Sequence, residues 1–273
     1  LTKELLDSGL PLESHQHLGY REVTAETALA LIGIKATGWV VPMCSPEGEQ
    51  YLHEEKPFFR FKPHQGQLKG EDPPKYISPK GGGCRPYFSP LMPAKSLADG
   101  KKLRITEGEK KTDCLNHHGF PTIGISGVDA WTDKRVAPKQ FIPELEEINW
   151  SGRDVLLVFD SDVTVKESVR ASLYRLTDAL SERGAQVFVV LLPCELNGDK
   201  NGVDDFIRND MIEEAVDLQN IDQEIFELLQ AEQDEKMRLV EAGFGDRHKR
   251  DLESFVSFLE ENAHHPAAVS DEL

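Results

Sequence analysis

The sequence predicts an α/β protein with a mostly parallel sheet, preceded by a small α+β module and followed by helices. After residue 100, strand-like and helix-like segments alternate, as expected of right-handed βαβ crossovers. The strand DVLLVFD at 154–160 is apolar on both faces, which is typical of a central parallel strand. Between 36 and 100, Pro and Gly recur around short apolar runs, which indicates a separate irregular module.

The first hundred residues predict the α+β module. Two helical segments are expected within 1–35, LTKELLDSGL and TAETALALIGI, with Thr24 as the N-cap of the second. Short β segments are expected at GWVVPM, PFFRF and KYIS. This module is assigned to residues 1–100.

Residues 101–210 predict the catalytic domain. The expected strands are KKLRIT, PTIGIS, DVLLVFD and AQVFVVLLP. The expected helices are EKKTDCLNHHG, QFIPELEEIN and VKESVRASLYRLTDALSERG. In the last of these, Val169, Leu173, Leu176 and Leu180 share one face, and Gly184 stands where a C-cap belongs. Helices are expected over 211–262, and a disordered tail over 263–273.

Composition indicates a globular cytoplasmic protein. Hydrophobic residues make up 39% of the 273 residues, and no signal peptide or membrane span is visible, so no membrane partner is expected. The cysteines, Cys44, Cys84, Cys114 and Cys194, form no CxxC pair, which argues against a zinc module or a disulfide framework. The chain begins with Leu and ends in a polar tail, which indicates a piece of something longer.

The net charge of −17 does not exclude a nucleic-acid partner, because most of the excess lies near the C-terminus. Residues 206–273 hold 6 basic and 18 acidic side chains, whereas residues 1–100 hold 11 and 12. A near-neutral N-terminal region can still present a basic face.

Carboxylates follow several of the predicted strands. Glu107 follows LRIT. Asp160 is the last residue of DVLLVFD, and Asp162 comes two residues later. Asp204 and Asp205 come after the fourth strand and its loop. The carboxyl ends of parallel strands meet at one edge, where ligands of open α/β sheets gather. Clustered carboxylates repel unless a cation lies among them, and Mg²⁺ prefers oxygen ligands. The pattern therefore predicts a site for Mg²⁺, or for Mn²⁺.

These residues also carry a resemblance. TEGEKKTD, then FDSD about fifty residues later, then an acidic pair, resembles the Toprim domain, a compact Rossmann-like fold. Primases, type IA and II topoisomerases, OLD-type nucleases and recombination-repair proteins share it. ITEGEKKTDCLNHHGFPTIGISG and NGVDDFI look most like the primase-like Toprim proteins of phages, plasmids and cyanobacteria, which are often fused to helicases. KYISPKGGG is similar to a Lys-Tyr segment that bacterial primases place before this domain.

The resemblance implies roles for individual residues. Glu107 becomes a general acid/base or metal-adjacent carboxylate, and the alternative is a strand-end Glu paired with Lys110 or Lys111. Asp160 and Asp162 become Mg²⁺ ligands, helped by Asp204 or Asp205.

Candidate phosphate-binding groups lie on both sides of Glu107 in the sequence. Lys75, Lys80 and Arg85 are suited to a triphosphate or template backbone, or else are solvated loop charges. Ser126 and Gly127 follow the second strand and can offer backbone N–H groups, although Ser-Gly is also an ordinary turn.

Three functions follow as hypotheses. The first is Mg²⁺-dependent primer synthesis from nucleoside triphosphates on single-stranded DNA, in a mobile-element or phage-like replicon and with a helicase partner. The second is phosphodiester cleavage by the same site, as in the Toprim nucleases. The third is a non-catalytic module that binds nucleic acid or a helicase.

Overall fold

The computed structural model describes residues 1–210 except 69, 71–72, 94, 99, 101, 134–139, 161–166 and 191–201. The chain divides into two compact units, Leu1–Asn149 and Trp150–Leu273. The predictions for Asp162, Cys194 and residues 211–273 lie outside the described residues.

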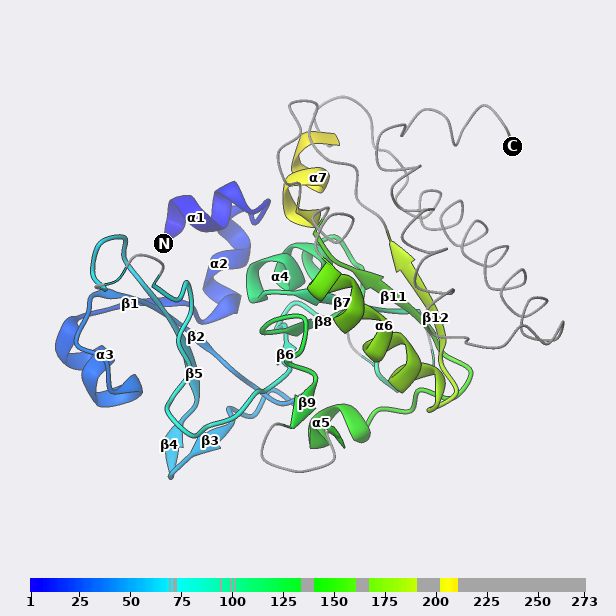
Figure 1. Cartoon of the computed structure of the whole chain (residues 1–273). Helices are drawn as coiled ribbons and strands as arrows, with labels where there is room; N and C mark the ends of the chain where they lie inside the picture. Colours follow the sequence, from blue (N-terminus) through cyan, green and yellow to red (C-terminus); the bar gives the residue numbers. More distant parts are fainter. Residues whose placement is uncertain are drawn as a thin grey trace, which may run out of the picture. The chain divides into compact units, whose positions relative to one another are not determined.

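Figure 1 shows the elements of both units. The helices are α1 (Thr2–Asp7), α2 (Leu12–Leu18), α3 (Ala25–Ile32), α4 (Glu109–His117), α5 (Pro143–Glu146), α6 (Glu167–Ser181) and α7 (Val203–Asp210). The strands of the first unit are β1 (Arg21–Val23), β2 (Gly38–Pro42), β3 (Leu52–His53), β4 (Lys56–Pro57), β5 (Phe59–Pro63), β6 (Tyr87–Phe88), β7 (Leu103–Glu107), β8 (Thr122–Ile125), β9 (Thr132–Asp133) and β10 (Gln140–Phe141). Those of the second unit are β11 (Asp154–Val158) and β12 (Gln186–Val190).

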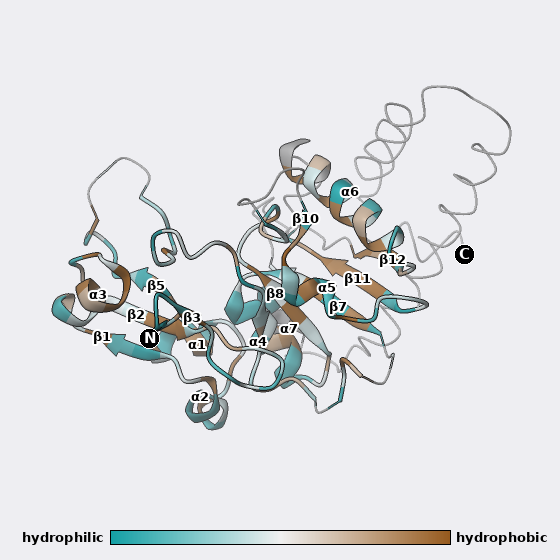
Figure 2. Ribbon diagram, turned by 90° about the horizontal axis from the view of Figure 1, so that it is seen from below, coloured by the Kyte–Doolittle hydropathy of each residue, from teal (hydrophilic) through white to brown (hydrophobic). Residues whose placement is uncertain are grey.

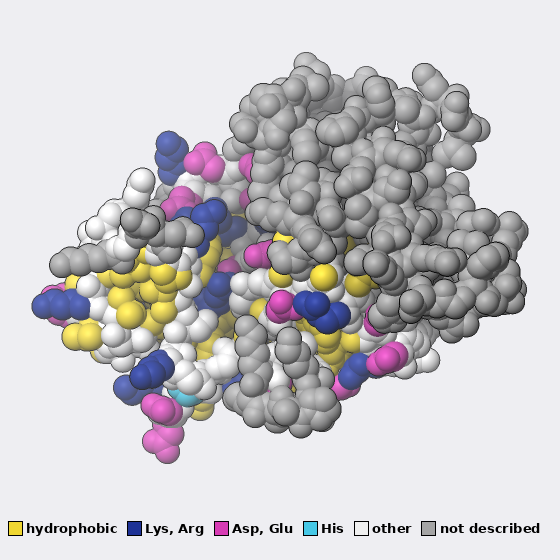
Figure 3. All heavy atoms as spheres, viewed as in Figure 1, with side chains coloured by type: hydrophobic (Ala, Val, Ile, Leu, Met, Phe, Trp, Pro, Cys, Tyr) yellow, Lys and Arg dark blue, Asp and Glu magenta, His cyan; other side chains and the backbone are white. Residues whose placement is uncertain are grey.

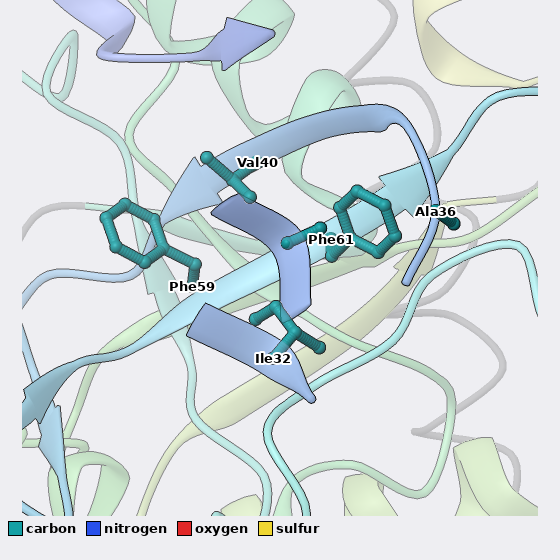
Figure 4. Close-up of a cluster of buried hydrophobic side chains, with 6 residues drawn as sticks. Ile32, Ala36, Val40, Phe59 and Phe61 are labelled. Carbon is teal, nitrogen blue, oxygen red and sulfur yellow. The ribbon is translucent and has the colours of Figure 1, made fainter. Parts of the chain in front are cut away.

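The N-terminal module is built on the antiparallel sheet β1–β2–β5, with α3 packed against it. Thr24 begins α3 as predicted, because its side chain accepts a hydrogen bond from the backbone N–H of Thr27. The apolar face of α3 and the sheet enclose a core that Figure 4 shows. Its buried members are Ala28, Ile32, Ala36, Val40, Phe59 and Phe61.

In the rest of the first unit, β7 and β8 pair in parallel and β6 joins β8 antiparallel. Helix α4 connects β7 to β8 and packs on both strands. Asn116 closes this crossover, because its side-chain amide donates to the carbonyls of Thr112 and Thr122 and its oxygen accepts from the Thr122 N–H. The close approach of helix and sheet requires Gly124, since a Cβ there would lie 2.4 Å from Thr112 Oγ1.

The second unit contributes another parallel pair, β11 with β12, joined through α6. Figure 2 shows β11 as a hydrophobic strand and α6 as a helix of mixed hydropathy. Leu173, Leu176 and Leu180 are buried, as the helical spacing predicts. The expectation of an α/β fold with a mostly parallel sheet is therefore confirmed.

Some predicted elements are shorter than expected. QFIPELEEIN forms β10 and then only the short helix α5, because Pro143 has no N–H to continue a helix and occupies its first turn. KYIS forms one isolated bridge, Phe61 with Ile77, instead of a strand. Helix α2 was not predicted.

Two further sequence expectations can be compared with the described residues. None of the described helices has both the length and the apolarity that crossing a bilayer requires. Cys44, Cys84 and Cys114 are free thiols, so no disulfide joins the described cysteines.

Candidate functional site

Glu107 lies where strand β7 turns into helix α4. It is the last residue of β7, is half-buried, and pairs in register with Ile125 of β8. Gly108 follows with φ +97°, a conformation that favours glycine, and caps α4. Its N–H donates to the Ile125 carbonyl at 2.9 Å. The strand end therefore presents the Glu107 carboxylate from a tightly bonded turn.

Ser126 and Gly127 lie at the same edge of the sheet as Glu107. They directly follow β8, whose last residue is the register partner of Glu107. Both are half-buried, and the Gly127 carbonyl accepts a bond from the Ala130 N–H at 2.8 Å. Their placement beside the Glu107 turn is the one that the parallel pairing predicted.

In the second unit, carboxylates lie beyond the strands. Asp160 comes two residues after β11, at its carboxyl end, and is 8% exposed. Asp204 and Asp205 occupy the first turn of α7, with Asp204 buried and Asp205 half-buried. Two buried carboxylates in one unit are costly unless hydrogen bonds or cations compensate them.

The predicted donors are all carboxylates, which suits Mg²⁺ or Mn²⁺. Asp160 and Asp204 are also buried, a position in which a carboxylate gains most from a cation. Among the described part of the chain, which omits Asp162, no three His, Cys, Asp or Glu side chains gather closely enough to hold an ion. The chemistry of the donors therefore fits the predicted metal.

The KYIS segment lies against strand β5 of the N-terminal module. Phe61 and Ile77 exchange two backbone hydrogen bonds of 2.8 Å each. Tyr76 is thereby placed over β5, where the guanidinium of Arg60 lies 4.7 Å from its ring centre. Lys75 and Lys80 are exposed on either side of this bridge. The segment therefore offers two lysines from a fixed backbone.

Arg85 differs from these lysines because protein groups already surround it. Its guanidinium donates to the carboxylate of Glu144 at 2.5 Å and lies 5.4 Å from the ring centre of Tyr51. Burial is the main reason that the pKa of Tyr51 rises, and the Glu144 carboxylate raises it further. Arg85 thus has a structural partner that the sequence did not indicate.

The sequence interpretation missed a buried ion pair directly after the Glu107 turn. Glu109 is the first residue of α4, a position where a carboxylate complements the helix dipole. Its carboxylate accepts a hydrogen bond from the Arg60 guanidinium, and the two side chains are 1% and 9% exposed. A charged residue in an otherwise apolar strand, FFRF, was the signal that could have drawn attention to Arg60.

A second buried network surrounds Asp113 on α4. Its carboxylate accepts hydrogen bonds from Tyr20 at 2.5 Å and Tyr87 at 2.9 Å, and also from Ser89. Burial raises the pKa of Asp113 to about 7; these hydrogen bonds oppose the rise, and the nearby Glu109 charge adds to it. Burial together with the Asp113 charge raises the pKa of both tyrosines.

Trp39, His15 and His64 each contact other protein groups. Trp39 is buried, stacks on Tyr20 and meets Tyr76 edge-on, so its ring packs in the interior of the N-terminal module. His15 lies within 2.9 Å of the Leu10 carbonyl, and His64 lies 3.0 Å from Glu22.

On the face that Figure 3 shows, Lys and Arg side chains are interspersed with Asp and Glu.

Comparison with solved structures identifies the fold. A structure described as the DnaG catalytic core is 14% identical, with a TM-score of 0.54, and the match covers 99% of this chain and 91% of that one. The DnaG primase catalytic domain bound to ssDNA gives a TM-score of 0.55 at 13% identity, over 96% and 87% of the two chains. The fold is that of the DnaG primase catalytic core. The RNA polymerase domain of Mycobacterium tuberculosis primase DnaG agrees, with a TM-score of 0.53, 12% identity, and coverage of 98% and 87%.

Sequence comparisons are less informative. Residues 98–214 match the family described as "Domain of unknown function (DUF3854)". No curated protein matched the chain. The matched segment begins just before β7 and ends shortly after α7, so it includes every carboxylate of the predicted metal site.

Proposed function

We propose that this chain is a primase-type nucleotidyltransferase that makes primers on single-stranded DNA with Mg²⁺ or Mn²⁺. The observation that carries the proposal is the match to the DnaG catalytic core over nearly the whole of both chains. The resemblance of TEGEKKTD and FDSD to the Toprim motifs, with their carboxylates beyond β7 and β11, supports the same chemistry.

The proposal assigns the metal to carboxylate oxygens. Asp160 and Asp162 would hold Mg²⁺, with Asp204 or Asp205 as a further ligand and Glu107 as an adjacent carboxylate or general base. When bound, the cation neutralises charge on the triphosphate and acidifies the attacking hydroxyl group. Two observations support these assignments: Gly108 forms a tight turn directly after Glu107, and Asp160 is buried beyond the end of β11.

Phosphate binding is assigned to the exposed lysines. Lys75 and Lys80 extend from the segment bonded to β5, so they can contact a triphosphate or a template backbone. The backbone N–H groups at Ser126 and Gly127 are the proposed contacts beside Glu107. Arg85 is already paired with Glu144, so we place less of the phosphate binding on it than the sequence suggested.

The context of the reaction is also a proposal. NGVDDFI and the TEGEKKTD segment resemble primase-like Toprim proteins of phages, plasmids and cyanobacteria. We therefore propose that the chain serves a mobile-element or phage-like replicon and works with a helicase domain or protein.

The test is primer synthesis on single-stranded DNA with nucleoside triphosphates and either metal, followed on a denaturing gel. Asp160→Asn is expected to lose about 100-fold or more in rate. Asp154→Asn is the matched control, because Asp154 stands at the opposite end of the same strand and should leave the rate nearly unchanged. Full activity in Asp160→Asn would refute the metal assignment. Nicking of plasmid DNA by the wild type, without primer synthesis, would favour the nuclease alternative.

A further inference from the structure

A buried ion pair joins strand β5 to the first turn of α4. The Arg60 guanidinium donates to the Glu109 carboxylate, and both side chains are more than nine-tenths buried. Among the described residues, neither Arg60 Nε nor Glu109 Oε2 has a hydrogen-bond partner, and both atoms are sealed from solvent. A ligand does not reach atoms so enclosed, and removing either partner leaves a buried charge uncompensated. The pair must therefore act through the groups attached to it.

One of those groups is the turn that carries Glu107. Only Gly108 separates Glu107 from Glu109. The Gly108 carbonyl accepts hydrogen bonds from the N–H of Thr112 at 3.2 Å and from its hydroxyl at 2.8 Å. On the sheet side, the Gly108 N–H is bonded to β8. The Glu109 side chain adds a further anchor, to Arg60 on strand β5 of the N-terminal module.

The other group is the Lys75–Tyr76 segment. Arg60 lies under the Tyr76 ring, and its neighbour Phe61 forms the double backbone bridge to Ile77. The same arginine therefore contacts the segment that carries Lys75 and the helix that begins after Glu107. Displacements of about 1 Å in a catalytic group can cost about 100-fold in rate, so a common anchor for both elements has a kinetic consequence.

We propose that Arg60 and Glu109 are positioning residues, whose ion pair holds the Glu107 turn and the Lys75–Tyr76 segment in one fixed arrangement for nucleotidyl transfer. This inference rests on the proposed primer synthesis. It assigns neither residue to the substrate.

The decisive variant replaces both charges, because a well-packed apolar pair removes the interaction without leaving a buried charge. Arg60→Met/Glu109→Leu is expected to remain folded, with a melting temperature within about 5 °C of the wild type. Its kcat for primer synthesis should fall about 100-fold. Its affinity for fluorescein-labelled single-stranded DNA should change less than about threefold, because the exposed lysines remain. His64→Gln, which removes an exposed contact with the Glu22 carboxylate, is the matched control. A folded double variant with wild-type kcat overturns the proposal.

A second variant changes the charge of the pair and keeps its shape. Glu109→Gln keeps the shape and one acceptor but loses the charge, so about a tenfold fall in kcat is expected. An unchanged kcat overturns the proposal here too.

Hydrogen exchange gives a readout that does not depend on activity. In Glu109→Gln, the amides of Gly108 and Thr112 should exchange about tenfold faster than in the wild type, while those of β5 stay protected. Unchanged exchange at both amides contradicts the positioning role. If the wild type makes no primers, but the two amides still exchange faster in Glu109→Gln, the proposed function is refuted. The anchoring of the turn is then still supported.

Discussion

The Asp113 carboxyl group should make the free energy of unfolding of the first unit fall as pH rises. A salt-bridged aspartate, whose pKa is lowered, has the opposite effect. Asp113 is fully buried on α4 and accepts hydrogen bonds from Tyr20 and Tyr87. Burial, together with the nearby charge of Glu109, holds its pKa at about 7 against an ordinary value of 3.8. Within the described part of the chain, these tyrosines, Ser89 and Glu109 are the groups that influence it most.

The sign and size follow from proton binding. Between pH 3.8 and about 7, the folded state keeps a proton that the unfolded state has lost, so the free energy of unfolding falls as pH rises. Each unit of pKa difference corresponds to about 1.4 kcal/mol. The loss contributed by Asp113 is therefore about 4 kcal/mol in total, of which about 2.5 kcal/mol falls between pH 5 and pH 8. Above pH 8 this contribution becomes constant.

Urea unfolding of the wild type and Asp113→Asn at pH 5, 6, 7 and 8 measures this effect. Asparagine does not titrate, and its carbonyl can still accept from Tyr20 while its amide donates to the Tyr87 oxygen. Relative to the wild type, the variant should therefore gain about 2–3 kcal/mol between pH 5 and pH 8. Asp178→Asn, at an exposed position on α6, controls for the loss of one negative charge. A stability difference that stays constant across these four pH values would refute the reasoning.

Substitutions at three further positions test the packing of the N-terminal module. Phe61→Ala should lower the free energy of unfolding by about 3–5 kcal/mol in urea titrations, because the ring is fully buried; a loss below 1 kcal/mol would contradict its place in the core. Gly38→Ala should lower the melting temperature and weaken the β2–β5 pairing, since the new Cβ would lie 2.2 Å from the Lys62 carbonyl oxygen; an unchanged melting temperature would argue against this register. Thr24→Ala should cost about 1 kcal/mol through the lost cap on α3, whereas Thr24→Ser should restore most of it.

Local sequence pattern was enough to predict most of the fold. The strands β7, β8, β11 and β12 and the helix α6 were expected because their hydrophobic periodicity is strong and their lengths are ordinary. The elements that differed were governed by single residues or by packing. Pro143 shortened the helix expected at 140–149, and α2 carries only a weak apolar pattern of its own.

The candidate site was only partly predictable for a related reason. Glu107 and Asp160 stand at strand ends, and strand ends can be read from the sequence. Arg60 and Glu109 are 49 residues apart, and Tyr20 and Asp113 are 93 apart. Only the packing of the N-terminal module on α4 brings these side chains together, and local periodicity carries no information about such contacts. Arg85 shows the same limit, because its partner Glu144 is distant in sequence.

Template-directed synthesis tests the central claim most directly. Purified chain is incubated with Mn²⁺ or Mg²⁺, a poly(dT) template and labelled ATP, and in parallel with labelled CTP, and the products are separated on a denaturing gel. If the chain is a primase-type nucleotidyltransferase, labelled oligomers form from ATP and not from CTP, and they disappear in Asp160→Asn. Absence of oligomers with both metals, or equal incorporation of ATP and CTP regardless of the template, would contradict it.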